Sequence, residues 1–167
     1  MTVARTSTPA RRTGGDRLTP LELGAWRELL RVHATLTREL DEELRRSHGL
    51  PLSSYDVLIY LRAAPGRRLR MAELADSVLL SRSGMTRLVD RLEREGLIVR
   101  DVCESDGRGS FAVLTEEGER VLSRARPTHL DGVRERFLRH FSAGELETLA
   151  GFWERVSPGA ADLIDPD

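Results

Sequence analysis

The stretch from Arg70 to Thr115 most constrains how this chain folds. Its first part carries apolar residues at the i, i+3, i+4, i+7 spacing of one helix face, at Met71, Leu74, Ala75 and Val78. The same spacing returns shortly afterwards, at Met85, Leu88, Val89 and Leu92. Ser81 is well placed to cap the second helix, because its oxygen can accept a backbone N–H, and Gly96 is expected to end it. The stretch therefore predicts two short helices joined by a tight turn.

Two short strands are predicted directly after the second helix. The first is Leu97–Val99 and the second is Phe111–Leu114. The polar segment between them has Asp106-Gly107-Arg108-Gly109 at its tip, which favours a hairpin turn. A helix-turn-helix followed by a two-stranded hairpin is a winged helix, and this wing carries an arginine at its tip.

The exposed face of the second helix suits DNA. Ser83, Arg87, Asp90 and Arg94 are expected to point away from the apolar stripe, with Thr86 and Arg91 on its flanks. The early residues of a recognition helix reach base edges in the major groove, where Ser, Thr and Arg all find hydrogen-bond partners. Ser81 and the first helical N–H groups suit a phosphate. The DNA contacts expected from the residues alone are Arg67, Arg68, Arg70, Ser81, Arg82, Ser83, Thr86, Arg87 and Arg91.

The strings GMTRLVDRLEREGLIVR and DGRGSFAVLTEEG resemble the MarR family of bacterial transcription regulators, and the resemblance extends from Thr19 to about Val156. It implies that the second helix reads the major groove and that an arginine at the wing tip enters the neighbouring minor groove. An Asp just before that arginine helps to hold the wing. The matching positions here are Arg108 and Asp106. Ser105 and Gly107 replace an acidic residue and an arginine of the family's wing, so fewer wing contacts are expected.

Long helices are predicted on both sides of this unit. Thr19-Pro20-Leu21-Glu22 starts one with a capping pattern, and Gly49 ends it. Ser53-Ser54 is expected to cap the next helix. Thr115 caps a long helix that Pro127 should kink or interrupt, and Ser142 with Glu145 caps the last. The predicted fold is mainly α, a winged helix-turn-helix with about six helices and a two-stranded wing.

The resemblance implies that the first and last helices interlock into a homodimer. The expected segments are a basic flexible tail (1–17), an N-terminal dimerisation helix (18–50), the DNA-binding region (51–115), C-terminal dimerisation helices (116–157) and a short tail (158–167).

The net charge and its distribution along the chain limit which functions are plausible. The net charge of −1 is unusual for a DNA-binding protein, but residues 62–94 carry eight arginines against four acidic residues. The distribution of charge matters more for DNA binding than its sum.

Cys103 is the only cysteine, which fits a reducing cytosol. No apolar run reaches transmembrane length. We therefore expect a cytoplasmic protein. Cys103 is either a redox switch or, as we favour, an ordinary thiol.

Other chemistry finds little support. No HExxH, phosphate-binding glycine loop or Ser/His/Asp grouping is recognisable, and the four histidines lack metal-ligand spacing. We expect no catalytic residue, no metal and no cofactor. The resemblance implies a small aromatic effector, for which Trp26, His33, Tyr55 and Arg62 are candidate ligands. The alternative for Trp26 and Tyr55 is a plain role in the core.

The sequence thus predicts a homodimeric repressor that reads double-stranded DNA at a pseudo-palindromic operator. The alternative is a helical dimerisation or partner-binding module that kept the winged helix and lost DNA reading. The near-neutral charge and the shortened wing motivate that alternative.

Overall fold

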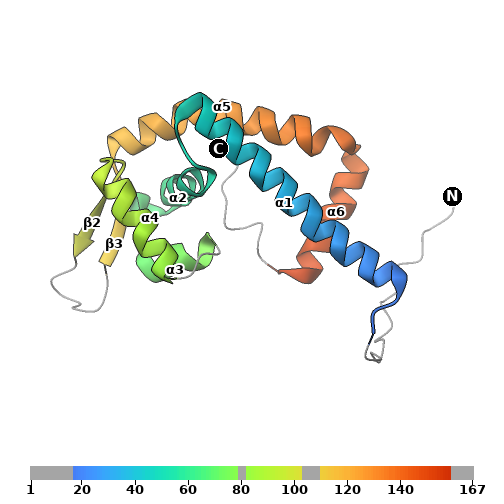
Figure 1. Ribbon diagram of the computed structural model, residues 1–167. Coiled ribbons are helices and arrows are strands. Elements are labelled where there is room, and N and C mark those ends of the chain that lie inside the picture. The colour runs from blue at the N-terminus through green and yellow to red at the C-terminus, as the bar shows by residue number, and fades with distance from the viewer. Residues whose placement is uncertain (1–16, 79–81, 103–109, 159–167) are drawn as a thin grey trace. The chain divides into compact units, whose positions relative to one another are not determined.

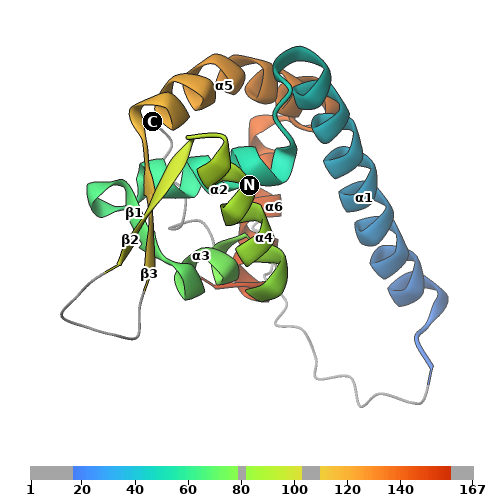
Figure 2. The same ribbon diagram turned by 60° about the vertical axis from the view of Figure 1, so that its left-hand side comes forward.

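The computed structural model describes residues 17–78, 82–102 and 110–158. These residues form six α-helices, two short 3-10 helices and three strands (Figures 1 and 2). In chain order the elements are α1 (Pro20–His48), α2 (Leu52–Ala63), η1 (Pro65–Arg67), β1 (Arg68–Arg70), α3 (Met71–Ser77), α4 (Arg82–Arg94), β2 (Ile98–Val102), β3 (Ser110–Leu114), α5 (Glu116–Arg136), η2 (Leu138–His140) and α6 (Ala143–Val156).

Local capping sets several helix ends where the sequence predicts them. At the start of α1 the Glu22 carboxylate accepts the N–H of Thr19 at 2.8 Å, and Gly49 follows the helix with φ of +65°. Thr115 caps α5 by accepting the N–H of Gly118 at 3.0 Å. Ser142 and Glu145 form a capping box at α6. Pro127 lies inside α5 and does not interrupt it.

The start of α2 differs from the expectation. The helix begins at Leu52 rather than at a serine cap, and the Asp41 carboxylate of α1 accepts the N–H of Leu52 at 2.9 Å. Of the two serines expected to cap it, Ser53 is half-buried and Ser54 is buried, and both lie inside the helix. Asp41 of α1 therefore caps the start of α2, a role that the sequence analysis assigned to a serine within α2 itself.

The wing sheet has three strands rather than two. Residues 68–70, for which the sequence predicts no strand, form β1 and pair antiparallel with β3, giving the order β1-β3-β2. Leu69 and Arg100 both pair with Ala112, so these three residues lie on one face of the sheet. Arg70 and Asp101 both pair with Phe111 on the opposite face.

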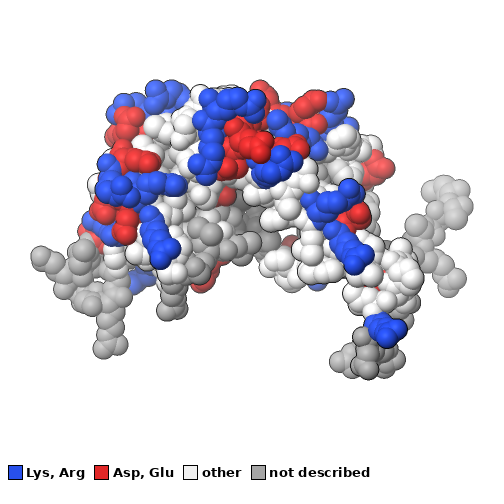
Figure 3. Space-filling model, in the orientation of Figure 1, with Lys and Arg blue, Asp and Glu red and all other residues white. Residues whose placement is uncertain are grey.

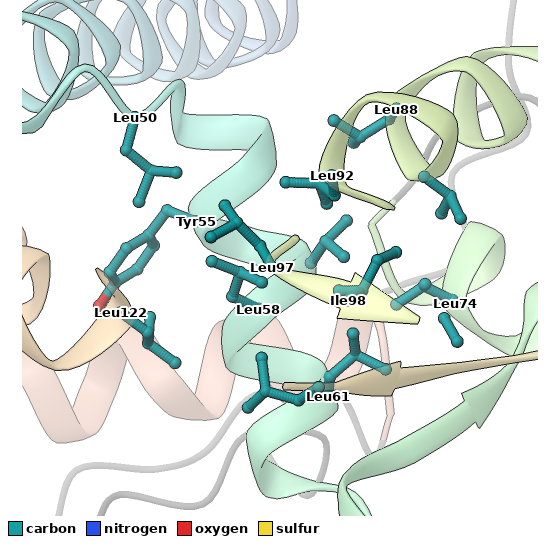
Figure 4. Close-up of a cluster of buried hydrophobic side chains, with 14 of the residues drawn as sticks. Leu50, Tyr55, Leu58, Leu61, Leu74, Leu88, Leu92, Leu97, Ile98 and Leu122 are labelled. Atoms are coloured by element: carbon teal, nitrogen blue, oxygen red, sulfur yellow. The ribbon is translucent and has the colours of Figure 1, made fainter. Parts of the chain in front are cut away.

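The chain divides within α1, between Thr35 and Leu36, into two units. The larger unit contains the hydrophobic core, which joins α2, α3, α4, the sheet and the first half of α5 (Figure 4). Tyr55, Leu58, Leu92 and Ile98 are all at most 1% exposed. This core holds the two helices of the motif and the base of the wing in one packed body.

The predicted mainly α winged helix-turn-helix is thus confirmed.

Candidate nucleic-acid interface

The buried face of α4 is the predicted apolar stripe. Met85, Val89 and Leu92 are at most 1% exposed, and Leu88 is 8% exposed. On α3, Leu74 and Ala75 are buried, and Met71 and Val78, the residue after the helix, pack against the core. The helix-turn-helix therefore follows directly from the spacing of its apolar residues.

The N-terminal half of α4 presents three polar side chains to solvent. Ser83, Thr86 and Arg87 are all exposed, as the sequence predicts. Helix α4 begins at Arg82, and the expected cap Ser81 lies outside the described residues, as does the side chain of Arg82. Two hydroxyls and a guanidinium on the first turns of one helix can donate to base edges and to phosphate oxygens.

The C-terminal half of α4 is tied to the protein instead. Arg91 is half-buried, and its Nη2 donates to the Ser54 hydroxyl of α2 at 2.6 Å. Asp90, which we expected to face outward, is half-buried and forms an ion pair with Arg100 of β2. Arg94 remains exposed.

The basic residues before α3 have partners within the chain. Arg67 has φ of +55°, and its Nη1 lies 3.7 Å from a Glu116 oxygen and 3.8 Å from a Glu119 oxygen. Both glutamates belong to the first turn of α5. Arg67 keeps an exposed side chain, so its charge is partly neutralised without being covered.

Arg68 and Arg70 both contact the ring of Phe111. The guanidinium carbons of Arg68 and Arg70 lie 4.0 Å and 4.9 Å from the centre of the Phe111 ring. Arg68 also reaches Asp101 at 3.3 Å. Cation–π contacts of this kind hold a guanidinium against a ring face, so they orient both arginines on the outer face of the sheet. This arrangement depends on the strand β1, which sequence reasoning missed.

Charges of both signs mix on the visible surface. Figure 3 shows arginines interspersed with acidic side chains rather than one continuous basic face. The tip of the wing, with Asp106 and Arg108, lies outside the described residues.

The candidate effector residues fall into different surroundings. Tyr55 is 1% exposed, and its ring centre lies 4.4 Å from that of His129. Burial raises the pKa of Tyr55, an effect that Arg62 and Arg126 oppose. Burial lowers the pKa of His129. Trp26 and His33 belong to the N-terminal unit, where both are exposed.

Arg62 lines a hollow of about 360 Å³ on α2 and α5. The other residues that line it are Ser123, Arg126, Pro127, Leu130, Asp131 and Arg134. Arg134 is paired with Asp131 at 2.9 Å, but three arginines against one acidic residue leave the hollow with an excess of positive charge. This excess favours an anionic occupant, because guanidinium groups bind carboxylates strongly. The sequence analysis did not name Arg126 and Arg134, because neither belongs to a recognisable motif. The only signal in the sequence was their position eight residues apart, about two helical turns, on one predicted helix.

Residues 17–78, 82–102 and 110–158 contain neither a candidate metal site nor a candidate membrane span. In that part of the chain no three His, Cys, Asp or Glu side chains gather in a way that could hold a metal ion. None of its helices combines the length and the apolarity that crossing a membrane requires.

Known proteins resemble the chain in both sequence and structure. A family model described as "MarR family" matches residues 48–109. The crystal structure of Sco3205, a MarR family transcriptional regulator from Streptomyces coelicolor in complex with DNA, is similar with a TM-score of 0.80. The two sequences are 37% identical, and the match covers 87% of this chain and 91% of that one.

Two further proteins that resemble this chain are also transcriptional regulators. AbsC, a MarR family transcriptional regulator from the same organism, has a TM-score of 0.78 and 34% identity, over 86% of this chain and 96% of AbsC. The transcriptional regulator HosA of Escherichia coli is 33% identical over 106 residues, which are 62% of this chain and 76% of HosA. The chain therefore belongs to the MarR family of transcriptional regulators.

Proposed function

We propose that this regulator binds double-stranded DNA sequence-specifically as a homodimer, with α4 in the major groove. The proposal rests on the contrast between the exposed polar face and the buried apolar face of α4. Its N-terminal half presents Ser83, Thr86 and Arg87 to solvent, while its apolar face is buried in the core. The similarity to Sco3205, which was crystallised in complex with DNA, supports DNA binding by this chain.

We assign the remaining DNA contacts to the phosphate backbone and the minor groove of the duplex. We assign phosphate contacts to Ser81, Arg82, Arg67, Arg68 and Arg70, since such contacts add affinity without reading sequence. Arg108 enters the flanking minor groove, where narrow A·T-rich segments attract arginine, and Asp106 holds the wing. We assign Arg91 to anchoring α4 rather than to a base, because its guanidinium donates to Ser54.

The homodimer is supported by exposed apolar side chains near both ends of the described chain. In the N-terminal unit, Leu21 is 80% exposed and Trp26 is 54% exposed. On α6, Val156 is 75% exposed and Phe152 is 48% exposed. Large exposed apolar groups of this kind mark interaction surfaces, and a second copy is the simplest cover. A two-fold pair then reads a pseudo-palindromic operator, on which we propose that it acts as a cytoplasmic repressor.

The proposal includes a small aromatic acid as effector. The hollow beside Arg62 offers guanidinium groups for a carboxylate and the side chains of Leu130 and Pro127 for a ring. Occupation of the hollow is expected to lower the affinity for the operator. A titration of the DNA complex with benzoate derivatives tests this, and Arg62→Met should weaken the response without changing the affinity in the absence of effector.

Selection of bound sequences from random duplex DNA tests the main proposal. The selected sequences should contain an inverted repeat whose half-sites lie about one helical turn, roughly 34 Å, apart. Sedimentation of the complex should give two chains per site. No enrichment, together with no gel retardation at low salt, would instead favour the partner-binding module that lost DNA reading.

A further inference from the structure

The outer face of the sheet carries an aromatic ring beside the start of the helix-turn-helix. The register of the three strands aligns Arg70, Phe111 and Asp101 in one row. Arg70 is the last residue of β1 and directly precedes Met71, the first residue of α3. Figures 1 and 2 show α3 and the arrowhead of β2 on the same side of the larger unit. The ring of Phe111 therefore lies at the end of the sheet that adjoins the two helices of the motif.

The two arginines that contact this ring differ in their other partners. The guanidinium carbon of Arg68 lies 4.0 Å from the ring centre, and its Nη1 lies 3.3 Å from a carboxylate oxygen of Asp101. Arg68 is half-buried, whereas Arg70 is exposed with its guanidinium carbon 4.9 Å from the ring centre. Arg68 is thus held within the sheet, and Arg70 is the member of the group that reaches the surface.

The acidic residues next to this group have partners of their own. Asp101 pairs with Arg68, and the Glu73 carboxylate accepts the backbone N–H of Arg70 at 3.0 Å. A guanidinium can contact a ring through its flat face and still donate its N–H groups to a phosphate. The contact between Arg70 and Phe111 is therefore compatible with a phosphate contact by the same arginine.

A ring under an exposed arginine lowers the entropic cost of using that arginine. A long side chain that is free in solution loses rotamer freedom when it binds. A side chain that is already held near its bound position loses less of that freedom on association. A leucine in place of Phe111 would keep an apolar group on the strand, but it lacks the π electrons that attract a cation.

We propose that Phe111 is a positioning residue for DNA binding, whose ring holds the guanidinium of Arg70 in place for a phosphate of the duplex. The inference rests on the proposed function, in which Arg70 contacts the DNA backbone. Arg68 and Asp101 keep the ring in its position on the sheet. A phosphate contact carries no sequence information, so Phe111 acts on the affinity for every duplex alike.

A double-mutant cycle on the full-length chain tests this role. Affinities for the selected operator and for a random duplex are measured over a salt titration for the parent, Arg70→Met, Phe111→Leu and the double variant. Arg70→Met should weaken binding to both DNAs about tenfold and lower the salt slope by about one. Phe111→Leu should weaken binding to both DNAs about threefold in the parent. In the Arg70→Met background, Phe111→Leu should change neither affinity.

Three further variants separate positioning from folding. Phe111→Tyr keeps an aromatic face and should bind both DNAs with the parental affinity. Arg120→Met removes an arginine that pairs with Glu117 within α5, and Phe111→Leu should still cost about threefold in that background. If Phe111→Leu fails to fold, Phe111→Ile replaces it, because a β-branched side chain suits a strand.

The outcomes distinguish this proposal from the proposed function. A threefold loss on Phe111→Leu that persists in the Arg70→Met background would show a purely structural role and overturn the positioning role, with DNA binding intact. If Arg70→Met leaves the affinity and the salt slope of the parent unchanged, then Arg70 contacts no phosphate and the positioning role fails. Binding through α4 would still stand in that case, because Arg87→Ala tests it separately.

Discussion

The guanidinium of Arg91 lies 2.6 Å from the hydroxyl oxygen of Ser54, a residue thirty-seven positions earlier in the chain. Ser54 is fully buried, and the contact joins α4 to α2. A hydrogen bond with one charged partner is stronger than a neutral one. The contact explains why an arginine on the flank of the recognition helix turns toward the protein.

Ser54→Ala removes the acceptor for Arg91 and should destabilise the fold by about 1–3 kcal/mol, because a half-buried charged donor loses its partner. Urea unfolding of the purified protein measures the change. Ser53→Ala, one residue earlier and half-buried, is the control and should change the free energy of unfolding by less than about 0.5 kcal/mol. Equal losses in both variants would show that the contact adds no stability.

Arg87→Ala should weaken binding to the selected operator by about 1–3 kcal/mol and relax specificity, because Arg87 presents an exposed guanidinium on the N-terminal half of α4. Arg67→Ala is the comparison, since a phosphate contact weakens all sequences alike. Affinities for operator and random duplex are measured over a salt titration. The base-reading role of Arg87 would be refuted by an equal loss on the two DNAs.

Gly118→Ala should destabilise the chain by roughly 3 kcal/mol or more, as severe overpacking does. A Cβ at this position would lie 2.1 Å from the Leu97 carbonyl oxygen and 2.7 Å from Leu114 Cδ1. Thermal unfolding measures the effect. Gly151→Ala in α6 meets nothing within 4 Å and should be neutral or stabilising, since alanine favours helix. A mild effect at Gly118 would mean that the start of α5 can move away from the wing.

Asp56→Asn should stabilise the protein at pH 7.5 by about 1–3 kcal/mol. Burial raises the pKa of Asp56 from its ordinary value of 3.8 to about 6. A raised folded-state pKa gives stability that is fully present below pH 3.8 and is lost as the pH rises through 6. The advantage of Asn should therefore shrink between pH 6 and pH 4.

Urea unfolding at pH 7.5 and pH 4.5 measures the Asp56 effect, with Asp76→Asn as an exposed carboxylate control on α3. A gain that is the same at both pH values would contradict the assigned ionisation of Asp56.

Local patterns in the sequence determined much of this protein. The apolar spacing of Met85, Val89 and Leu92 predicted which face of α4 is buried, and Thr115 capped α5 as expected. These features depend on interactions within about four residues, so they can be seen without knowing the rest of the fold. The exposure of Arg87 follows from the same helical geometry.

Only the tertiary structure decided the partners of the polar side chains and the third strand. Residues 68–70 become a strand because β3, some forty residues later, supplies their hydrogen bonds. Asp41 caps α2, Arg91 turns to Ser54, and Asp90 turns to Arg100. Periodicity describes one element at a time. A polar group that leaves water takes whichever partner the packing of other elements brings to it.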